Sequence, residues 1–391
     1  MLEKNFHCFS CMNKLNQNVK FCPICGNEIS NEKIIKSALN PGTILNQRYL
    51  LGHVVKKDNK TLTYIALDKN IESRILVVEL FIKDMVERLD QKIFVKNFKN
   101  EEIFEEIKTN FSLVHQNLMK FRIFPNALKI YEVFFTNGTV YVVKEISKGI
   151  TFNEYLSNNY GELPWSHSTK LFLDLIKFLR NIHSLKMIHR DLNPNNLYFE
   201  NNMLKIIDFT NAKINTNYNL KFDLNDGYSA PEQYENAEVG TYTDVYSLAA
   251  IMYKSLTGTK PVNSISRLSN DNLLSPNILN SNIPKNISFA ISSALVLAPK
   301  LRTQTMKDFY EDLTAPERTN NRIINISKKE NIKKVKEKKT KKQTEEKNYV
   351  KEKKEPKTKN IIFLSFLISC SIVSFFLVIA IFLLFGENLL D

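Results

Sequence analysis

The chain has 391 residues, of which 43% are apolar and 24% are charged, and this length allows two or three folding units of roughly 150 residues each. The composition excludes a collagen, a wholly disordered chain and a disulfide-rich mini-protein. The net charge of +13 is uneven: residues 328–359 hold 15 Lys and 6 Glu, and the first 327 residues carry only +6. The basic balance therefore describes one segment and is weak support for a nucleic-acid-binding domain.

Four of the five cysteines form two CxxC pairs near the N-terminus, namely Cys8, Cys11, Cys22 and Cys25. Each pair fits a tight turn that presents two thiolates to one metal ion, and two such turns close a tetrahedral Cys₄ shell. Gly26 suits the positive φ that the second turn requires. Residues 1–30 resemble a zinc ribbon, which predicts one structural Zn²⁺ bound by all four cysteines, with a pair of redox dithiols as the alternative. We also expect Phe21 to pack in the small core.

A larger domain follows over residues 48–315. Its first part contains short β-rich runs, such as Arg74–Phe81 and Thr139–Glu145, and its remainder contains helical patterns, such as Ser168–Leu185 and Asp244–Thr257. A β-rich start with a helical remainder predicts an α+β domain with two lobes.

The most informative stretch of this domain runs from His189 to Asn196 and reads HRDLNPNN, followed by Asp208 in the run IIDFT. These stretches resemble the catalytic loop and the DFG segment of protein kinases. The resemblance implies that Asp191 orients and deprotonates an acceptor hydroxyl, and that Asn196 and Asp208 hold Mg²⁺ against the phosphates of ATP. It also implies that Arg190 links the catalytic loop to the activation segment.

Further motifs of the same family follow in order. Glu232 lies in GYSAPEQY, which resembles the end of the activation segment, and Arg302 matches the arginine that pairs with this glutamate. Asp244 matches the residue that holds the backbone of the catalytic loop, and the run from Gly138 to Glu145 matches the strand that leads to the hinge. Over residues 48–315 the chain is thus similar to bacterial serine/threonine protein kinases with an N-terminal zinc ribbon, which implies the bilobal kinase fold.

The sequence departs from this family in the ATP-binding lobe. The segment that matches the glycine-rich loop, residues 56–61, reads KKDNKT and holds no glycine, although glycine lets the loop backbone approach the phosphates. Asp58 places a carboxylate in this segment. Val78 stands where the family pattern has its phosphate-binding lysine. Lys60 is the candidate for a relocated lysine, of the kind that the with-no-lysine kinases use.

Three other positions of the lobe depart from the family pattern. The glutamate partner of the missing lysine is expected at His115, with Glu105 and Glu106 as candidates if the helix is extended. Thr210 replaces the glycine of the DFG segment. Lys144 occupies the gatekeeper position, from which its ammonium is expected to reach the nucleotide pocket.

Beyond this domain, residues 316–359 are rich in Lys, Glu, Asn and Thr and are predicted to form an unfolded linker. Residues 361–385 carry no charge and would make a helix about 37 Å long, against a hydrocarbon core of about 30 Å. They predict one transmembrane helix, with a buried core helix as the alternative. The positive-inside rule then predicts a single-pass protein of the cell membrane, with the N-terminus and the kinase-like domain in the cytoplasm and residues 386–391 outside.

Three hypotheses of function follow. The first is a membrane-tethered serine/threonine kinase that binds Mg²⁺ and ATP and transfers the γ-phosphoryl group slowly to protein hydroxyls. The second is a pseudokinase that serves as a signalling scaffold, and the third is a zinc-ribbon interaction protein. Adenine is expected to contact the backbone of the hinge residues Glu145, Ile146 and Ser147. The sequence names no protein substrate or signalling partner, and the few basic residues of the ribbon argue against nucleic-acid binding.

Overall fold

A computed structural model describes residues 6–15, 19–29, 35–159, 161–214, 224–235 and 237–316. The predicted transmembrane segment 361–385, the external tail and the linker from residue 317 onward lie outside these residues. Within the described ranges, no helix combines the length and the apolar character that a membrane crossing requires.

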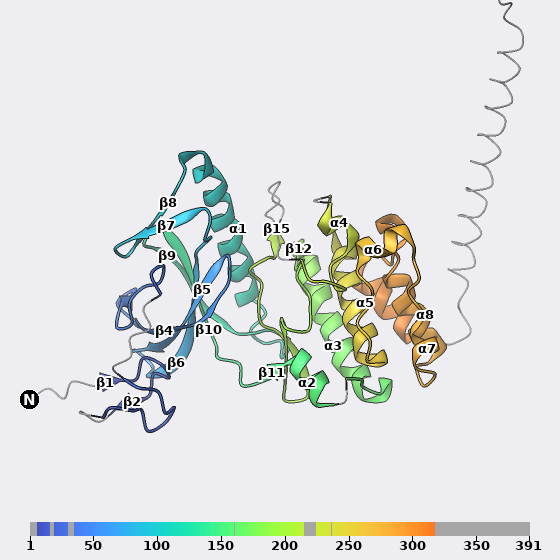
Figure 1. Cartoon of the computed structure of the whole chain (residues 1–391), viewed down its shortest axis with the longest axis horizontal. Helices are drawn as coiled ribbons and strands as arrows, with labels where there is room; N and C mark the ends of the chain where they lie inside the picture. Colours follow the sequence, from blue (N-terminus) through green and yellow to red (C-terminus); the bar gives the residue numbers. More distant parts are fainter. Residues whose placement is uncertain are drawn as a thin grey trace, which may run out of the picture. The chain divides into compact units, whose positions relative to one another are not determined.

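An antiparallel sheet of six strands forms the first lobe, in the order β3-β4-β5-β6-β10-β9 (Figure 1). Its central strands are rich in β-branched and aromatic residues, which favour extended structure and pack well on a pleated surface. The predicted strands at Arg74–Phe81 and Thr139–Glu145 are confirmed to within one residue at each end. The six strands are β3 (Ile44–Leu45), β4 (Tyr49–Lys57), β5 (Thr61–Asp68), β6 (Ser73–Leu80), β9 (Ile130–Thr136) and β10 (Thr139–Lys144).

A helix and a second hairpin complete this lobe. The helix packs its apolar face against β9 and β10, and the hairpin follows β6. These elements are β7 (Val86–Leu89), β8 (Lys92–Val95), the 3₁₀ turn η1 (Phe98–Asn100) and α1 (Glu101–Met119).

A buried carboxylate ties the β7–β8 hairpin to the sheet. Glu79 is fully buried and lies 2.6 Å from the guanidinium of Arg88, and the hydroxyls of Tyr64 and Tyr141 donate to the same carboxylate. A buried charge is tolerated only when it is paired and hydrogen-bonded. No sequence motif marks this cluster, which joins the β7–β8 hairpin to the sheet of the first lobe.

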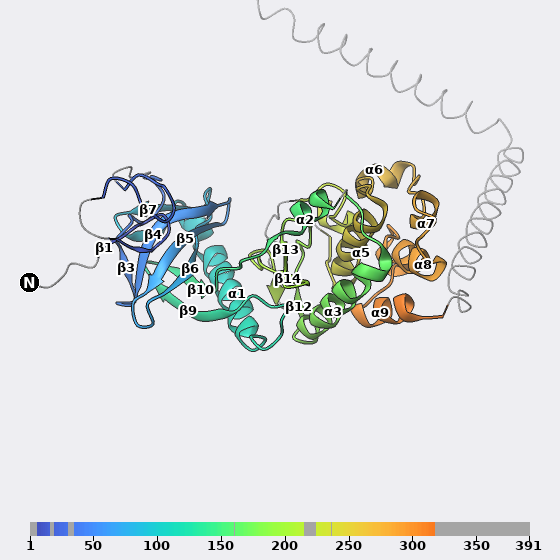
Figure 2. The same cartoon turned by 90° about the horizontal axis from the view of Figure 1, so that it is seen from below.

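The second lobe is mainly helical (Figures 1 and 2). Its central helix α5 is buried along most of its length because small and apolar residues occupy all its faces. The predicted helices Ser168–Leu185 and Asp244–Thr257 are confirmed as α3 and α5, although each begins three residues earlier. The helices are α2 (Phe152–Asn158), α3 (Trp165–Ser184), α4 (Pro231–Tyr234), α5 (Thr241–Thr257), α6 (Ser264–Ser269), α7 (Pro276–Leu279), α8 (Lys285–Ala294), the 3₁₀ turn η2 (Pro299–Leu301) and α9 (Met306–Thr314).

Short strands at the junction of the lobes position the residues of the catalytic motifs. One strand ends directly before His189 and another ends two residues before Asp208, so both motifs start from hydrogen-bonded backbone. The strands are β11 (Ile150–Thr151), β12 (Met187–Ile188), β13 (Leu197–Glu200), β14 (Met203–Ile206) and β15 (Lys213–Ile214).

The cysteine module packs against the first lobe, where β1 (Phe6–His7) and β2 (Lys14–Leu15) lie beside the six-stranded sheet (Figure 1). The carbonyl of Phe9 accepts a hydrogen bond of 2.7 Å from the backbone N–H of His53. A Cβ atom on Gly52 would lie 2.3 Å from that carbonyl oxygen, so only glycine permits this approach. The side chain of Met12 packs against Ile65. The module and the lobe therefore share one interface.

Candidate functional site

One buried carboxylate holds the catalytic loop. Asp244, in the first turn of α5, accepts hydrogen bonds of 2.8 Å from the backbone N–H groups of His189 and Arg190, and it lies 2.8 Å from Nε2 of His183. Burial alone would raise the pKa of Asp244, but the two histidines hold it below its ordinary value. The charged carboxylate thus fixes the loop backbone, including the left-handed conformation of Arg190 with φ of 65°.

Arg190 lies between the catalytic loop and the segment that follows Asp208. Its Nε donates to the backbone carbonyl of Asn211 at 2.7 Å, and its own carbonyl accepts from Nε2 of Gln233 at 2.7 Å. Burial lowers the pKa of Arg190 to about 10, so the guanidinium stays charged at neutral pH. The link between the two segments is the one that the kinase resemblance implies, and it makes Arg190 a positioning residue.

Four side-chain amides surround the carboxylate of Asp191. Asn193 and Asn225 donate to Oδ1 at 3.0 and 2.7 Å, while Asn196 and Asn211 donate to Oδ2 at 2.9 and 2.8 Å. A carboxylate has about four acceptor positions, so these donors fill them. Burial raises the pKa of Asp191 and the amides oppose this shift. Another hydrogen-bond donor can therefore reach Asp191 only by displacing one of these amides.

Three of these four amides were missed by the sequence analysis. Only Asn196 belongs to a motif with a known role. Asn193 lies inside the HRDLNPNN stretch, at a position to which the motif assigns no role. Asn211 and Asn225 lie where the sequence shows no pattern, and Asn225 reaches Asp191 from 34 residues away.

Asn196 and Asp208 face the same cavity as Asp191. This cavity has a volume of about 180 Å³ and is lined by all three residues. The amide nitrogen of Asn196 is directed to Asp191, which leaves its carbonyl oxygen available, and Asp208 contributes a carboxylate. Carboxylate and amide oxygens are ligands that Mg²⁺ takes. The donor set therefore fits Mg²⁺.

Two lysines of the first lobe converge on Asp208. The Nζ of Lys56 lies 2.6 Å from Oδ2 of Asp208, and the Nζ of Lys144 donates to the backbone carbonyl of Ile207 at 3.1 Å. Burial alone would raise the pKa of Asp208, but these two ammonium groups hold it far below its ordinary range. The cation that Val78 does not provide is thus supplied from β4 and from the gatekeeper position on β10.

Lys60 occupies a different place. Its buried Nζ donates to Oδ1 of Asn211, whose amide nitrogen in turn donates to Asp191. Lys60 lines the same cavity as Asp208, as expected for a relocated lysine, but the ion pair with Asp208 is made by Lys56.

Asp58 caps the turn that replaces the glycine-rich loop. Its Oδ1 accepts hydrogen bonds of 2.8 and 2.7 Å from the backbone N–H groups of Lys60 and Thr61, and its Oδ2 accepts one of 2.8 Å from the hydroxyl of Thr61. In a glycine-rich loop such N–H groups are free to approach phosphate. Here a carboxylate of the chain itself occupies them, so the turn contributes lysines rather than backbone donors.

Among the described residues, α1 brings no glutamate to the site. Glu105 and Glu106 are exposed, and Glu105 pairs with Lys108 of the same helix, so neither is the expected partner of a phosphate-binding lysine. His115 is buried, and burial lowers its pKa to about 4, which leaves the ring neutral at pH 7. The helix instead contacts the segment after Asp208 through Asn110, whose amide donates to the carbonyl of Ala212 at 2.9 Å.

A second cavity of about 280 Å³ continues from the first, with which it shares Lys56 and Asp208. Leu76, Val78 and Leu128 form apolar walls, and the hinge residues Glu145, Ile146 and Ser147 line it as well. An apolar slot beside the half-buried hinge residues fits a planar heteroaromatic ring. The two cavities together fit a nucleotide whose phosphates lie toward Asp208.

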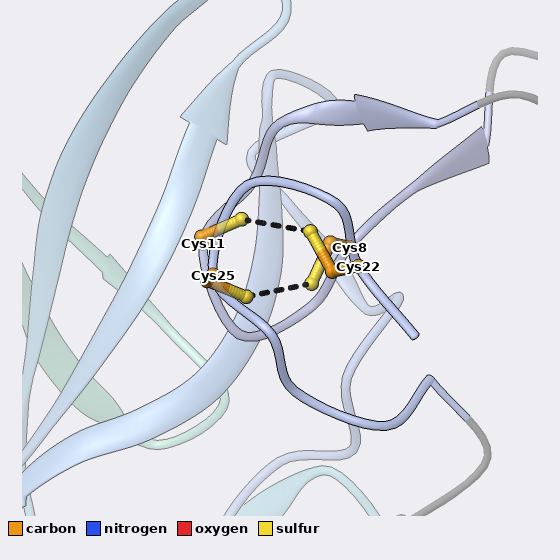
Figure 3. A group of neighbouring side chains, drawn as sticks. All are labelled: Cys8, Cys11, Cys22 and Cys25. Atoms are coloured by element: carbon orange, nitrogen blue, oxygen red, sulfur yellow. Dashed lines mark hydrogen bonds between the residues drawn. The ribbon is translucent and has the colours of Figure 1, made fainter. Parts of the chain in front are cut away.

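The four cysteines form a compact cluster (Figure 3). The Sγ atoms of Cys8 and Cys25 lie 3.7 Å apart, as do those of Cys11 and Cys22, and all four lie within 4.8 Å of one another. Four thiolates bound tetrahedrally to Zn²⁺ at about 2.3 Å have sulfur–sulfur separations of about 3.8 Å. The geometry therefore fits one Zn²⁺.

Local backbone geometry supports this cluster. Gly26 has a φ of 71°, as expected from the second CxxC turn. Burial alone would raise the pKa of the Cys22 thiol, but backbone N–H groups of the turn lower it to about 7, whereas burial raises the pKa of the Cys8 thiol to about 12 and also raises that of Cys25. The prediction for Phe21 is wrong: its side chain is 54% exposed, and the small core consists of cysteines, Leu15 and Ile29.

Replacing Cys22 with Ser should remove the metal from the ribbon. We expect one Zn²⁺ per wild-type chain and none in Cys22→Ser, because three thiolates no longer close the tetrahedral shell. Elemental analysis of protein purified under reducing conditions measures this. A wild-type preparation with reduced thiols and no stoichiometric metal would contradict the assignment.

Comparison with known proteins agrees with this geometry. The family model for the protein kinase domain matches residues 81–324, more than half of the chain, and begins just after the strand that carries Val78. Probable serine/threonine-protein kinases of Clostridium perfringens and Clostridium acetobutylicum are 27% and 24% identical over 70% of this chain.

The chain spans about two fifths of the length of these relatives, since the matches cover 38% and 40% of them. A solved structure titled "PpkA-294 apo form" matches 71% of this chain and 99% of its own, with a TM-score of 0.57 and 20% identity, and so shares the fold. From its family match, its bilobal fold and its ordered motifs, the chain belongs to the protein kinase family.

Proposed function

We propose that this protein is a serine/threonine protein kinase of low turnover, tethered to the cell membrane through residues 361–385, with its kinase domain in the cytoplasm. The convergence of Lys56 and Lys144 on Asp208, beside Asp191, carries this proposal. These two ammonium groups supply positive charge that Val78 on β6, at the position of the family's lysine, does not provide. When bound, Mg²⁺–ATP provides the γ-phosphoryl group and neutralises the charge that develops during its transfer.

The residues of the chain divide the work as follows. Asp191 accepts the proton of the acceptor hydroxyl after an amide such as that of Asn225 has moved away. Asn196 and Asp208 would hold Mg²⁺ through their side-chain oxygens, and Lys56, which pairs with Asp208 in this structure, would give up that ion pair to contact a phosphate oxygen. Because the turn at Asp58 offers few free backbone donors, we expect phosphoryl transfer to be slow.

A pseudokinase is the second candidate function. The capped turn at Asp58 and the four amides on Asp191 favour it, since both occupy groups that an active kinase keeps available. In this case nucleotide binding persists and the chain acts as a scaffold.

Nucleotide binding with and without Mg²⁺, followed by mass spectrometry for autophosphorylation, tests both candidates. We expect ATP binding that depends strongly on Mg²⁺ and is lost in Asp208→Asn, and phosphorylation that is lost in Asp191→Asn while binding remains. Binding without any phosphorylation would establish the pseudokinase. The absence of Mg²⁺-dependent binding in wild-type protein would overturn the assignment of Asn196 and Asp208.

A further inference from the structure

A cavity of about 480 Å³ lies between the cysteine module and the first lobe. None of the residues that line it also lines the two cavities of the kinase site. The module contributes His7, Met12, Asn13 and Lys14, and the lobe contributes the remaining wall from β4, β5, β6 and the turn between β5 and β6. The cavity therefore exists only while the module is docked.

Three of the seven polar residues that line this cavity are Lys or Arg, and all three are exposed. Lys14, Lys69 and Arg74 line it together with one carboxylate, Glu72. Within the part of the chain that the structure describes, none of these three cations forms an ion pair. The Nδ1 atom of His7 is buried in the same wall and has no hydrogen-bond partner among the described residues. The cavity thus holds an excess of positive charge and unused polar groups.

The remaining wall is apolar, formed by Met12, Leu50 and Leu67. A ligand that matches both walls carries a compact negative charge on a carbon skeleton. A phosphomonoester has a charge of about −1.5 to −2 and three strong acceptor oxygens. A guanidinium can donate two parallel hydrogen bonds to such a group, and two lysine ammonium groups add positive charge.

We propose that this cavity binds the phosphorylated side chain of a serine or threonine within a peptide. The net charge of its lining balances one phosphomonoester dianion, and the apolar wall suits the neighbouring peptide carbons. Nucleic acid fits less well, because no Phe, Tyr or Trp lines the cavity for base stacking and three cations do not form an extended stripe. The site is separate from the kinase reaction and does not depend on turnover.

Docking of the module is part of this site. Gly52 packs against the backbone carbonyl of Phe9, and a Cβ atom on residue 52 would force the module away from the lobe. A bound phosphopeptide that contacts both walls should stabilise the docked arrangement, because a ligand of one conformation shifts the population toward it. Binding of a phosphorylated peptide would then favour the arrangement in which the module is docked beside β4, the strand that carries Lys56.

Fluorescence anisotropy with full-length protein tests the site. The probes are a labelled peptide with one phosphoserine flanked by leucines and the same peptide without phosphate. We expect the phosphorylated form to bind at least tenfold more tightly, and Arg74→Ala and Lys69→Ala each to weaken it about tenfold or more, since each removes a hydrogen bond to a charged group. The matched control is Lys92→Ala, an exposed lysine on β8 outside the cavity.

Two further variants separate the site from general unfolding. Gly52→Ala should lose binding while it keeps Zn²⁺ and all cations of the cavity, and Arg74→Lys should keep part of the affinity. Melting temperature and zinc content are measured for each variant. Equal affinity for the two peptides, or unchanged binding in Arg74→Ala, would overturn the proposal. Tighter binding of single-stranded DNA, or competition by inorganic phosphate at the same concentration as the phosphopeptide, would also overturn it.

Discussion

Replacing Glu232 with alanine should lower the free energy of unfolding by about 3–5 kcal/mol, because it leaves a buried charge without its partner. Both carboxylate oxygens contact the guanidinium of Arg302, at 2.7 and 3.0 Å, and the side chains of Glu232 and Arg302 are 3% and 0% exposed. The hydroxyl of Thr243 donates to the same carboxylate at 2.9 Å. The pair joins the end of the activation segment to the C-terminal part of the second lobe.

A matched control for this variant is Glu311→Ala. Glu311 and Lys307 form a pair 3.8 Å apart with both side chains about 60% exposed, and such surface pairs contribute about 0–1 kcal/mol. Urea unfolding followed by circular dichroism measures both variants. An equal, small effect of the two substitutions would contradict the role of Glu232. The result is independent of catalysis, so it tests the fold of the second lobe alone.

The second lobe could be predicted from sequence because its key contacts join residues of fixed type at fixed places. Asp244 accepts hydrogen bonds from backbone N–H groups, and this role requires a carboxylate. Arg302 pairs with the buried carboxylate of Glu232, and this role requires a guanidinium. Such residues stand out against an apolar background. By contrast, the amides of Asn211 and Asn225 reach Asp191 only because the fold brings distant segments of the chain together. Nothing in the sequence around these two residues indicates the contact.

The ATP-binding lobe could be predicted only in part, and strand geometry explains the difference. Val78 could be placed at the nucleotide cavity because it stands where the family pattern has its phosphate-binding lysine, and it does line that cavity. The pairing of β4 with β5 shifts register between Val54 and Lys56, and a bulge of this kind redirects the side chains that follow it. Which lysine of the KKDNKT segment turns toward Asp208 therefore could not be read from alternation, and Lys56 was not expected in that role.

The aromatic residues of the cysteine module show the same limit. Phe21 and Phe9 are both candidates for its core by composition, yet Phe21 is exposed and Phe9 contacts the first lobe near Gly52. The CxxC spacing fixes where the thiolates lie, but it does not indicate which face of the module meets another domain.

Replacing Lys56 with alanine should slow phosphoryl transfer by about 10²–10³-fold, the usual cost of removing one preorganised charge-stabilising group. Lys56 is the ammonium that lies 2.6 Å from Asp208. Its neighbour Lys57 provides the matched control, since its Nζ donates instead to the hydroxyl of Ser37 at 3.2 Å. Lys57→Ala removes the same charge from the same strand and should change the rate little. The rate constant of autophosphorylation in single-turnover experiments measures both.

A rescue variant tests whether the loss of rate in Lys56→Ala comes from the missing positive charge at the site. Val78 lines the nucleotide cavity at the position where the family pattern has its lysine, so Val78→Lys in the Lys56→Ala background should restore part of the rate. Equal losses in Lys56→Ala and Lys57→Ala would mean that long-range charge matters rather than the ion pair with Asp208. An unchanged rate in Lys56→Ala would transfer the role to Lys144, whose half-buried ammonium is the second cation facing Asp208, and Lys144→Met should then abolish transfer.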